Sequence, residues 1–339
     1  MKIMNENNDD DCFNIEEGND YDVGEEITGL VCFSGGKDST AMLLRMIELD
    51  DPIKYPITRI CFADTTFEFP DLYAYIDHIQ LYLDSNYPER GFVIEKLQSK
   101  RTWDDWFYGE ITRGKAKGAI RGAPFTTQPC WWSREAKVTP LEKAAKEINA
   151  NFQFIGIAAD ETRRISKNPK TIRYPLVDWG WTEQDCMAYL EHLGIPNSLY
   201  ENFNRLGCFH CIKAGPADFH ATWANHPEEW KIAKHYSAEN TRLVGRNWIP
   251  AYTLEELEEL FEQGFVPKRH RELECNTCNA VSFFSDGTVE MEDFDTDEAI
   301  EHDPRFKDSS MNKTIIEEAK EKIEWVPPSQ RATKGLGWI

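Results

Sequence analysis

Residues 31–44 read VCFSGGKDSTAMLL, and they combine an apolar run, two glycines, a lysine and the start of a helical pattern. Gly35 and Gly36 allow backbone amides to turn toward an anion without an intervening Cβ. The helix beginning near Asp38 offers free N–H groups and the positive end of its dipole. Lys37 adds a full positive charge, and Ser34 and Ser39 add hydroxyl donors. This combination predicts a phosphate-binding loop between a strand and a helix.

The loop is not a Walker A motif. That motif requires Gly-x4-Gly-Lys-Ser/Thr, whereas the order here is Ser-Gly-Gly-Lys-Asp-Ser. The alternative interpretation is a capped strand–helix turn without a ligand. Such a turn needs neither two glycines nor a lysine, so we favour phosphate binding by a different class of loop.

Strand-like and helical patterns alternate along the first half of the chain. This order predicts parallel βαβ units and an α/β fold with a doubly wound, mostly parallel sheet. Ligands bind beyond the carboxyl ends of the strands in such sheets. We therefore expect three polar clusters that follow strands to meet at one edge: residues 34–39, 64–68 and 160–164.

The distribution of charge and the pattern of predicted strands and helices divide the chain into three parts. Most of the net charge of −21 comes from two acidic blocks, residues 1–26 and 285–303. We expect 1–26 to be a flexible leader, 27–215 to form the nucleotide-binding domain, and 216–339 to be a helical extension with a Cys-x-x-Cys element and a hairpin at 280–291. The chain shows no membrane-spanning run or signal peptide, so we expect a cytoplasmic protein.

The nine cysteines do not suggest a disulfide framework, because the count is odd and the chain is long. Cys32, Cys61 and Cys186 lie in apolar runs typical of buried small side chains. Two pairs differ, because the spacing of Cys208-x-x-Cys211 and Cys275-x-x-Cys278 is typical of metal or cluster ligation.

Several motifs together resemble one family. The loop Ser34–Ser39 matches the PP-loop of the ATP pyrophosphatase superfamily, and the surrounding chain resembles its phosphoadenosine phosphosulfate (PAPS) reductase-like branch. The resemblance covers residues 27–215 and implies a Rossmann-like adenine nucleotide alpha hydrolase fold. It is carried in order by FADTTFEFPDLYAYI, QPCWWSREAKVTPLEK, ADETRR and YPLVDWGWTEQDCMAYLEHLGIPNSLY with RLGCFHC.

The resemblance implies cleavage of ATP at the α-phosphate with release of pyrophosphate. Lys37 and the loop amides would hold the departing phosphates, and Asp38 would help to place Mg²⁺. Arg163 and Arg164 would neutralise phosphate or a second anion. The cofactor-binding residues expected in this way are Ser34, Gly35, Gly36, Lys37, Asp38, Ser39, Thr40, Asp64, Thr65, Asp160 and Glu161.

The same branch contains two chemistries. Sulfonucleotide reductases attack sulfur with a cysteine in a Glu-Cys-Gly tail, but the nearest counterpart here is Glu274-Cys275-Asn276. Cluster-dependent thiolation enzymes use three cysteines on a [4Fe–4S] cluster, which leaves one iron open for sulfide. The complete ATP-type loop favours ATP-dependent adenylation coupled to sulfur transfer. The alternatives are a sulfonucleotide reductase and a non-catalytic nucleotide-binding regulatory module.

Three cysteines are the first candidates for a metal or cluster site: Cys130, Cys208 and Cys211. A [4Fe–4S] cluster is the favoured occupant, with zinc and free thiols as alternatives. Cys275 and Cys278 would be half of a zinc site, a further cluster ligand or a redox pair. We also expect ATP, Mg²⁺ and a sulfur donor protein or sulfide as cofactors and partners, and a homo-oligomer.

A basic stretch interrupts the acidic chain. Residues 100–137 contain eight Lys and Arg against four acids, interleaved with tryptophans. Such a surface suits a nucleic-acid or nucleotide substrate. An ordinary solvated loop over the site is the alternative.

Overall fold

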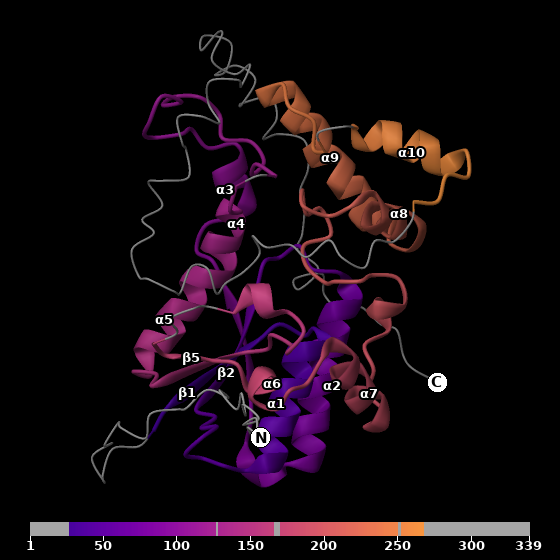
Figure 1. Cartoon of the computed structure of the whole chain (residues 1–339). Helices are drawn as coiled ribbons and strands as arrows, with labels where there is room; N and C mark the ends of the chain where they lie inside the picture. The colour runs from indigo at the N-terminus through magenta and orange to yellow at the C-terminus, as the bar shows by residue number, and fades with distance from the viewer. Residues whose placement is uncertain (1–26, 127, 166–169, 250–251, 268–339) are drawn as a thin grey trace, which may run out of the picture.

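The computed structural model describes residues 27–126, 128–165, 170–249 and 252–267. The expected α/β architecture is confirmed (Figure 1). Five parallel strands form one sheet in the order β3-β2-β1-β4-β5. The strands are β1 (Gly29–Phe33), β2 (Arg59–Asp64), β3 (Ile94–Gln98), β4 (Phe152–Ile155) and β5 (Ile172–Arg173).

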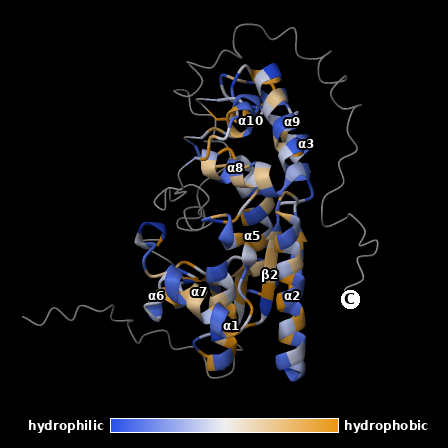
Figure 2. Cartoon of the chain, turned by 90° about the vertical axis from the view of Figure 1, so that its right-hand side faces the viewer, coloured by the Kyte–Doolittle hydropathy of each residue, from blue (hydrophilic) through white to orange (hydrophobic). Residues whose placement is uncertain are grey.

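Helices cover both faces of the sheet. Side chains alternate between the two faces along each strand, so each face presents apolar side chains that helices bury. Val31 and Phe33 of β1 belong to the large core that includes α1 (Lys37–Leu49) and α2 (Pro70–Asn86). Leu30 faces the opposite side, in a cluster with Leu141 of α5 (Thr139–Glu147). Figure 2 shows β2 largely in the hydrophobic colour.

Short helices connect the sheet to the rest of the chain. They are η1 (Pro88–Arg90), α3 (Trp103–Phe107), α4 (Trp131–Ser133), η3 (Thr162–Arg164), α6 (Pro175–Asp178), α7 (Glu183–His192) and η4 (Ser198–Glu201). Thr182 is the N-cap of α7 and forms a capping box with Asp185.

The C-terminal helical part contains α8 (Pro216–Asn225), α9 (Pro227–Val244) and α10 (Leu254–Glu262). These helices lie together beside α3 in Figure 1. A hydrogen bond of 2.8 Å from the Tyr236 hydroxyl of α9 to Asp104 joins the two regions. No helix among the described residues has both the length and the apolar composition needed to cross a membrane.

Two details differ from the sequence-based expectation. The sequence pattern predicts one helix over residues 135–148, but the helical segment begins at α4 and passes through a π-helical part, η2 (Arg134–Val138), before α5. This wider turn accommodates Pro140, which has no N–H to donate to an α-helical bond. The strand β5 was not expected, since its two residues are too short to show a period. The predicted hairpin at 280–291 lies outside the described residues.

We predict that Gly156→Ala destabilises the fold, because a Cβ there would lie 2.7 Å from both the backbone N and the Cα of Ser39. Overpacking of this kind costs about 1–3 kcal/mol of unfolding free energy. Chemical denaturation of the variant measures it. Gly207→Ala is the matched control, since nothing lies within 4 Å of a Cβ at that position. Equal stability of the two variants would contradict the prediction.

Candidate functional site

The Ser-Gly-Gly-Lys-Asp-Ser loop links the carboxyl end of β1 to the N-terminus of α1. Gly35 adopts a positive φ of 71°, and a Cβ there would lie 2.9 Å from side-chain atoms of Leu72 and Ile76. Both constraints favour glycine at this turn. The loop therefore brings the N-terminal amides of α1 to the carboxyl edge of the sheet, where parallel α/β proteins bind ligands.

The two loop serines form one hydrogen-bonded unit. Their hydroxyl oxygens are 2.8 Å apart, and the Ser34 amide donates to Ser39 Oγ at 3.1 Å. The hydroxyls of Ser39 and Thr40 both donate to the Gly36 carbonyl, at 3.1 and 2.9 Å. Ser34 is exposed, whereas Ser39 and Thr40 are buried. Ser34 is thus the loop hydroxyl best placed to meet a ligand.

Lys37 is only 5% exposed, which a lysine tolerates when its charge is paired. Its Nζ lies 2.9 Å from Asp38 Oδ2 and 2.5 Å from Glu183 Oε2. Burial alone would lower the pKa of Lys37, but the neighbouring charges, led by Asp38, raise it above its ordinary value. The lysine is therefore a permanent cation beside the loop.

Asp38 is the second charged residue of the loop. Burial raises its pKa to about 6, although Lys37 acts in the opposite direction, and Glu183 and Glu161 add to the rise. Its Oδ1 is buried without a hydrogen-bond partner. A carboxylate oxygen of this kind suits a hard cation, because Mg²⁺ at nucleotide sites takes one or two carboxylates together with phosphate oxygens.

The polar clusters expected at the sheet edge are placed in different ways. Asp64 ends β2 and accepts hydrogen bonds from the Thr66 amide, the Tyr73 hydroxyl and the Gln98 side-chain amide at 2.6–2.8 Å. Its direct neighbour Thr65 contacts the cysteine pocket described below. These bonds hold the Asp64 carboxylate in a fixed position at the edge.

The third cluster follows β4. Asp160 is exposed and accepts from the Glu183 amide at 3.2 Å. Glu161 is buried and pairs with Arg164 at 2.5 Å. Arg163 is exposed. The cluster is linked to the loop by charge, because Glu161 and Glu183 both act on Asp38.

Sequence reasoning missed three residues at the loop. Tyr200 Oη accepts a hydrogen bond from the Lys37 amide at 3.1 Å, and its ring centroid lies 5.1 Å from Lys37 Nζ. Asn197 donates to the Gly35 carbonyl at 3.1 Å. Glu183 forms the ion pair described above. The sequence carries no signal for these contacts beyond their place in a segment that resembles the family.

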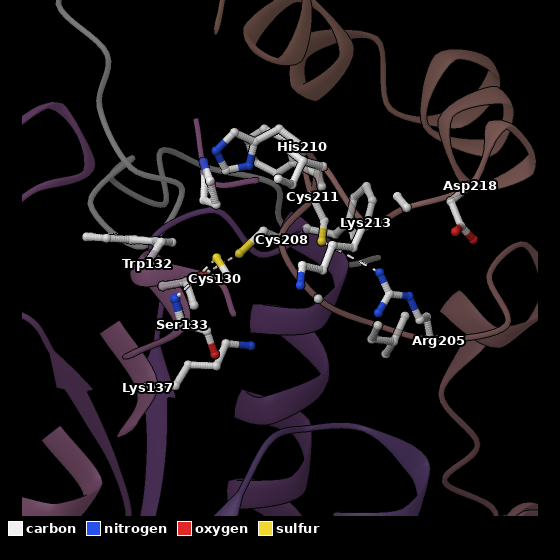
Figure 3. A pocket seen from close by; sticks show the side chains of 18 of the residues that line it. Cys130, Trp132, Ser133, Lys137, Arg205, Cys208, His210, Cys211, Lys213 and Asp218 are labelled. Atoms are coloured by element: carbon white, nitrogen blue, oxygen red, sulfur yellow. Dashed lines mark hydrogen bonds between the residues drawn. The ribbon is translucent and has the colours of Figure 1, made fainter. Parts of the chain in front are cut away.

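A second site, the cysteine pocket, lies at the same edge. Cys130, Cys208 and Cys211 all line it, and Figure 3 shows the three side chains around one hollow. Cys130 precedes α4, and its sulfur accepts from the Ser133 amide at 3.4 Å. Burial, with a contribution from Cys211, raises the pKa of the Cys130 thiol to about 11.

Cations surround this pocket. Lys137, Arg205 and Lys213 line it, and Arg205 donates to Cys211 Sγ at 3.6 Å. Figure 3 places Lys137 on one side of the cysteines and Lys213 with Arg205 on the other. Burial raises the pKa of Cys208 above its ordinary value, so thiolates here require a compensating positive charge. The cations can supply part of that charge.

The pocket is connected to the end of β2 by a chain of hydrogen bonds. The Cys208 thiol donates to Thr65 Oγ1 at 3.4 Å, and Thr65 donates to Glu68 Oε1 at 2.9 Å. Lys137 Nζ is 3.1 Å from the same Glu68 oxygen. Thr65, expected beside the nucleotide, therefore contacts the cysteine pocket.

The cysteine pocket suits an iron–sulfur cluster by its chemistry. Three thiols, the usual protein ligands of such clusters, share one lining with cationic side chains. No group of three His, Cys, Asp or Glu side chains within the described parts of the chain is arranged to hold a single metal ion. A four-iron cluster binds each thiolate through a different iron, so its ligands need not converge on one point. Cys275 and Cys278 lie outside the described residues.

Comparison with curated proteins gives distant relatives. An uncharacterized protein from Methanocaldococcus jannaschii is 25% identical over 237 residues, covering 65% of this chain and 44% of the relative. A PAPS reductase from Proteus mirabilis is 25% identical over 150 residues, with coverages of 42% and 55%. The chain therefore spans about half the length of these two relatives. An uncharacterized 37.8 kDa protein of Escherichia phage 186 is 24% identical over 250 residues, with coverages of 60% and 73%.

Two solved structures resemble the chain at low scores. A PAPS reductase from Candida auris, in a phosphate complex, has a TM-score of 0.36 at 18% identity and covers 56% of this chain and 84% of its own. A U34-tRNA thiolase from Methanococcus maripaludis with its [4Fe–4S] cluster has a TM-score of 0.32 at 13% identity, with coverages of 73% and 84%.

A protein-family model matches more than half of the chain. The family described as the phosphoadenosine phosphosulfate reductase domain matches residues 28–214, which include the loop, the five strands and the three described pocket cysteines. The resemblance found in the sequence motifs is thereby confirmed. The chain belongs to the phosphoadenosine phosphosulfate reductase domain family.

Proposed function

We propose that the protein uses ATP to adenylate a substrate and couples this activation to sulfur transfer onto a nucleotide or nucleic acid. The observation that carries the proposal is the position of two sites at one sheet edge. The complete Ser-Gly-Gly-Lys-Asp-Ser loop follows β1, and Thr65, which immediately follows β2, contacts the cysteine pocket. β1 and β2 are paired neighbours, so activation and sulfur chemistry would take place close together.

In the adenylation step, an oxygen of the acceptor attacks the α-phosphorus of ATP. The bond between the α-phosphorus and the bridging oxygen breaks, and pyrophosphate leaves with the electron pair. Lys37 and the amides at the start of α1 would hold the departing phosphates, while Asp38 would hold Mg²⁺. This is catalysis by positioning and charge. Arg163 and Arg164 remain candidates for neutralising an anionic substrate.

In the second step a sulfur nucleophile replaces the adenylated oxygen, and AMP leaves. Cys130, Cys208 and Cys211 would hold an iron–sulfur cluster, which when bound supplies an open iron able to carry sulfide. Lys137, Lys213 and Arg205 would offset the negative charge of thiolates. The proposal thus gives the cationic lining of the pocket a role.

The basic stretch supports an anionic, base-containing acceptor. The guanidinium groups of Arg101 and Arg121 lie 5.2 and 4.8 Å from the ring centroid of the buried Trp106. Cation–π contacts of this kind hold arginine side chains in fixed directions. Arginine side chains are also suited to phosphate recognition by paired hydrogen bonds.

A sulfonucleotide reductase is the second candidate, because the family and the Proteus mirabilis relative carry that name. Thiol-dependent release of sulfite from PAPS without ATP cleavage would establish it. Tight ATP binding without turnover would instead favour a regulatory nucleotide-binding module. Assays with ATP alone, PAPS alone and both together separate the three functions.

We predict that Lys37→Ala lowers pyrophosphate release from ATP by about 10²–10³-fold, the loss typical when one transition-state donor is removed. A coupled pyrophosphate assay with a candidate acceptor measures the rate. Lys143→Ala is the control, because Lys143 is an exposed lysine of α5. An unchanged rate in Lys37→Ala would show that this loop does not bind ATP.

We predict that protein purified without oxygen contains iron and acid-labile sulfide and absorbs in the visible range. Cys130→Ser, Cys208→Ser and Cys211→Ser should each lose most of the iron, because each would remove one ligand of the same cluster. Cys61→Ala is the control, since Cys61 is buried within the sheet. A colourless protein that holds only zinc would contradict the cluster.

A further inference from the structure

Two acceptors of the chain itself, Tyr200 and Glu183, contact Lys37 of the phosphate loop. Tyr200 Oη accepts a hydrogen bond from the Lys37 amide at 3.1 Å, at the N-terminus of α1. The Glu183 carboxylate lies 2.5 Å from Lys37 Nζ. An oxygen on the first helix amide and an anion on the lysine are the contacts that phosphate groups make at loops of this kind. Two of the chain's own acceptors thus occupy positions that a nucleotide would use.

These two acceptors are held by structured elements. Tyr200 lies in η4, and Asn197 caps that helix by accepting from the Leu199 amide at 3.0 Å. The same Asn197 donates to the Gly35 carbonyl at 3.1 Å, so η4 is attached directly to the loop. Glu183 is the first residue of α7, just after the capping Thr182. The segment from α7 to η4 therefore covers the loop in a defined position.

The cover is built so that a ligand can displace it. The Glu183 side chain is 42% exposed, so it can move into solvent at small cost, whereas the Lys37 side chain is 6% exposed. Displacing Tyr200 frees the Lys37 amide. No side chain at position 36 blocks the vacated space, because this residue is a glycine, and a Cβ there would lie 3.0 Å from the tyrosine hydroxyl. An incoming polyphosphate replaces both contacts with stronger, more highly charged acceptors.

We propose that Glu183 and Tyr200 form an internal gate that occupies the phosphate position and is displaced when ATP binds. This inference rests on the proposed function, in which the loop holds the β- and γ-phosphates. The gate lowers the apparent affinity for ATP and for pyrophosphate, because in the closed state the amide and the ammonium group of Lys37 already have partners that a phosphate must displace. Its return after cleavage competes with the bound pyrophosphate and promotes product release.

The gate predicts a gain of affinity on mutation. Tyr200→Phe removes the hydroxyl acceptor and Glu183→Gln removes the charge, so each should strengthen pyrophosphate and ATP binding by about three- to ten-fold, the effect of one net hydrogen bond. AMP binding should change by less than two-fold, because AMP lacks the phosphates that compete with the gate. Isothermal titration calorimetry with pyrophosphate, ATP and AMP measures all three.

Two exposed residues of the same types serve as controls. Glu191→Gln changes an exposed acid of α7, and Tyr252→Phe changes an exposed tyrosine of the helical part. Neither should alter binding. Because Glu183 is partly exposed, Glu183→Gln remains informative even if Tyr200→Phe fails to fold.

The outcomes separate this inference from the proposed function. If the wild type binds ATP and pyrophosphate but both variants bind pyrophosphate equally or more weakly, the gate is overturned. The proposed function then stands, because ATP still binds the loop. Failure of the wild type and of both variants to bind ATP or pyrophosphate would overturn the proposed function and the gate together. If the variants bind pyrophosphate more strongly and lose this binding when Lys37→Ala is added, both the gate and the proposed function are supported.

Discussion

The close approach of the Gly156 backbone to the first turn of α1 is the contact on which the candidate site depends. A Cβ at this position would lie 2.7 Å from the Ser39 backbone, so no other residue fits without displacement. The contact holds the helix N-terminus against the chain that follows β4. The polar cluster after β4 is thereby brought within electrostatic range of the loop. A glycine far from the loop in sequence therefore sets the geometry of the phosphate position.

Charge balance around Lys37 is the second organising feature. A buried ammonium group needs partners, and Asp38 and Glu183 provide them. The same arrangement crowds carboxylates together, which contributes to the raised pKa of Asp38. A bound nucleotide with Mg²⁺ would rearrange these charges, because it brings both anions and a cation. The residues that pair with Lys37 in this structure are thus the natural candidates to move when a nucleotide binds.

In the proposed function, the position of the loop beside the cysteine pocket would let one sheet edge combine two chemistries. The segment after β2 contributes Asp64 to the support of the edge and Thr65 to the pocket. The neighbouring strand β1 ends in the loop. Parallel pairing places both ends at the same edge. In the proposed function, this position would keep the adenylated intermediate close to the cysteine pocket.

Much of this organisation was predictable from local sequence. The order of apolar runs and helical patterns predicted the parallel α/β sheet, because strand and helix periods are local properties. The glycines and lysine of residues 34–39 predicted the loop, and the Cys-x-x-Cys spacing indicated a shared pocket for Cys208 and Cys211.

What the sequence could not show was the pairing of distant side chains. The contacts of Lys37 with Glu183 and Tyr200 span about 150 residues, and no local pattern encodes them. Only tertiary folding brought them together, since the η4 segment reaches the loop through Asn197 and the packing of α7 on α1.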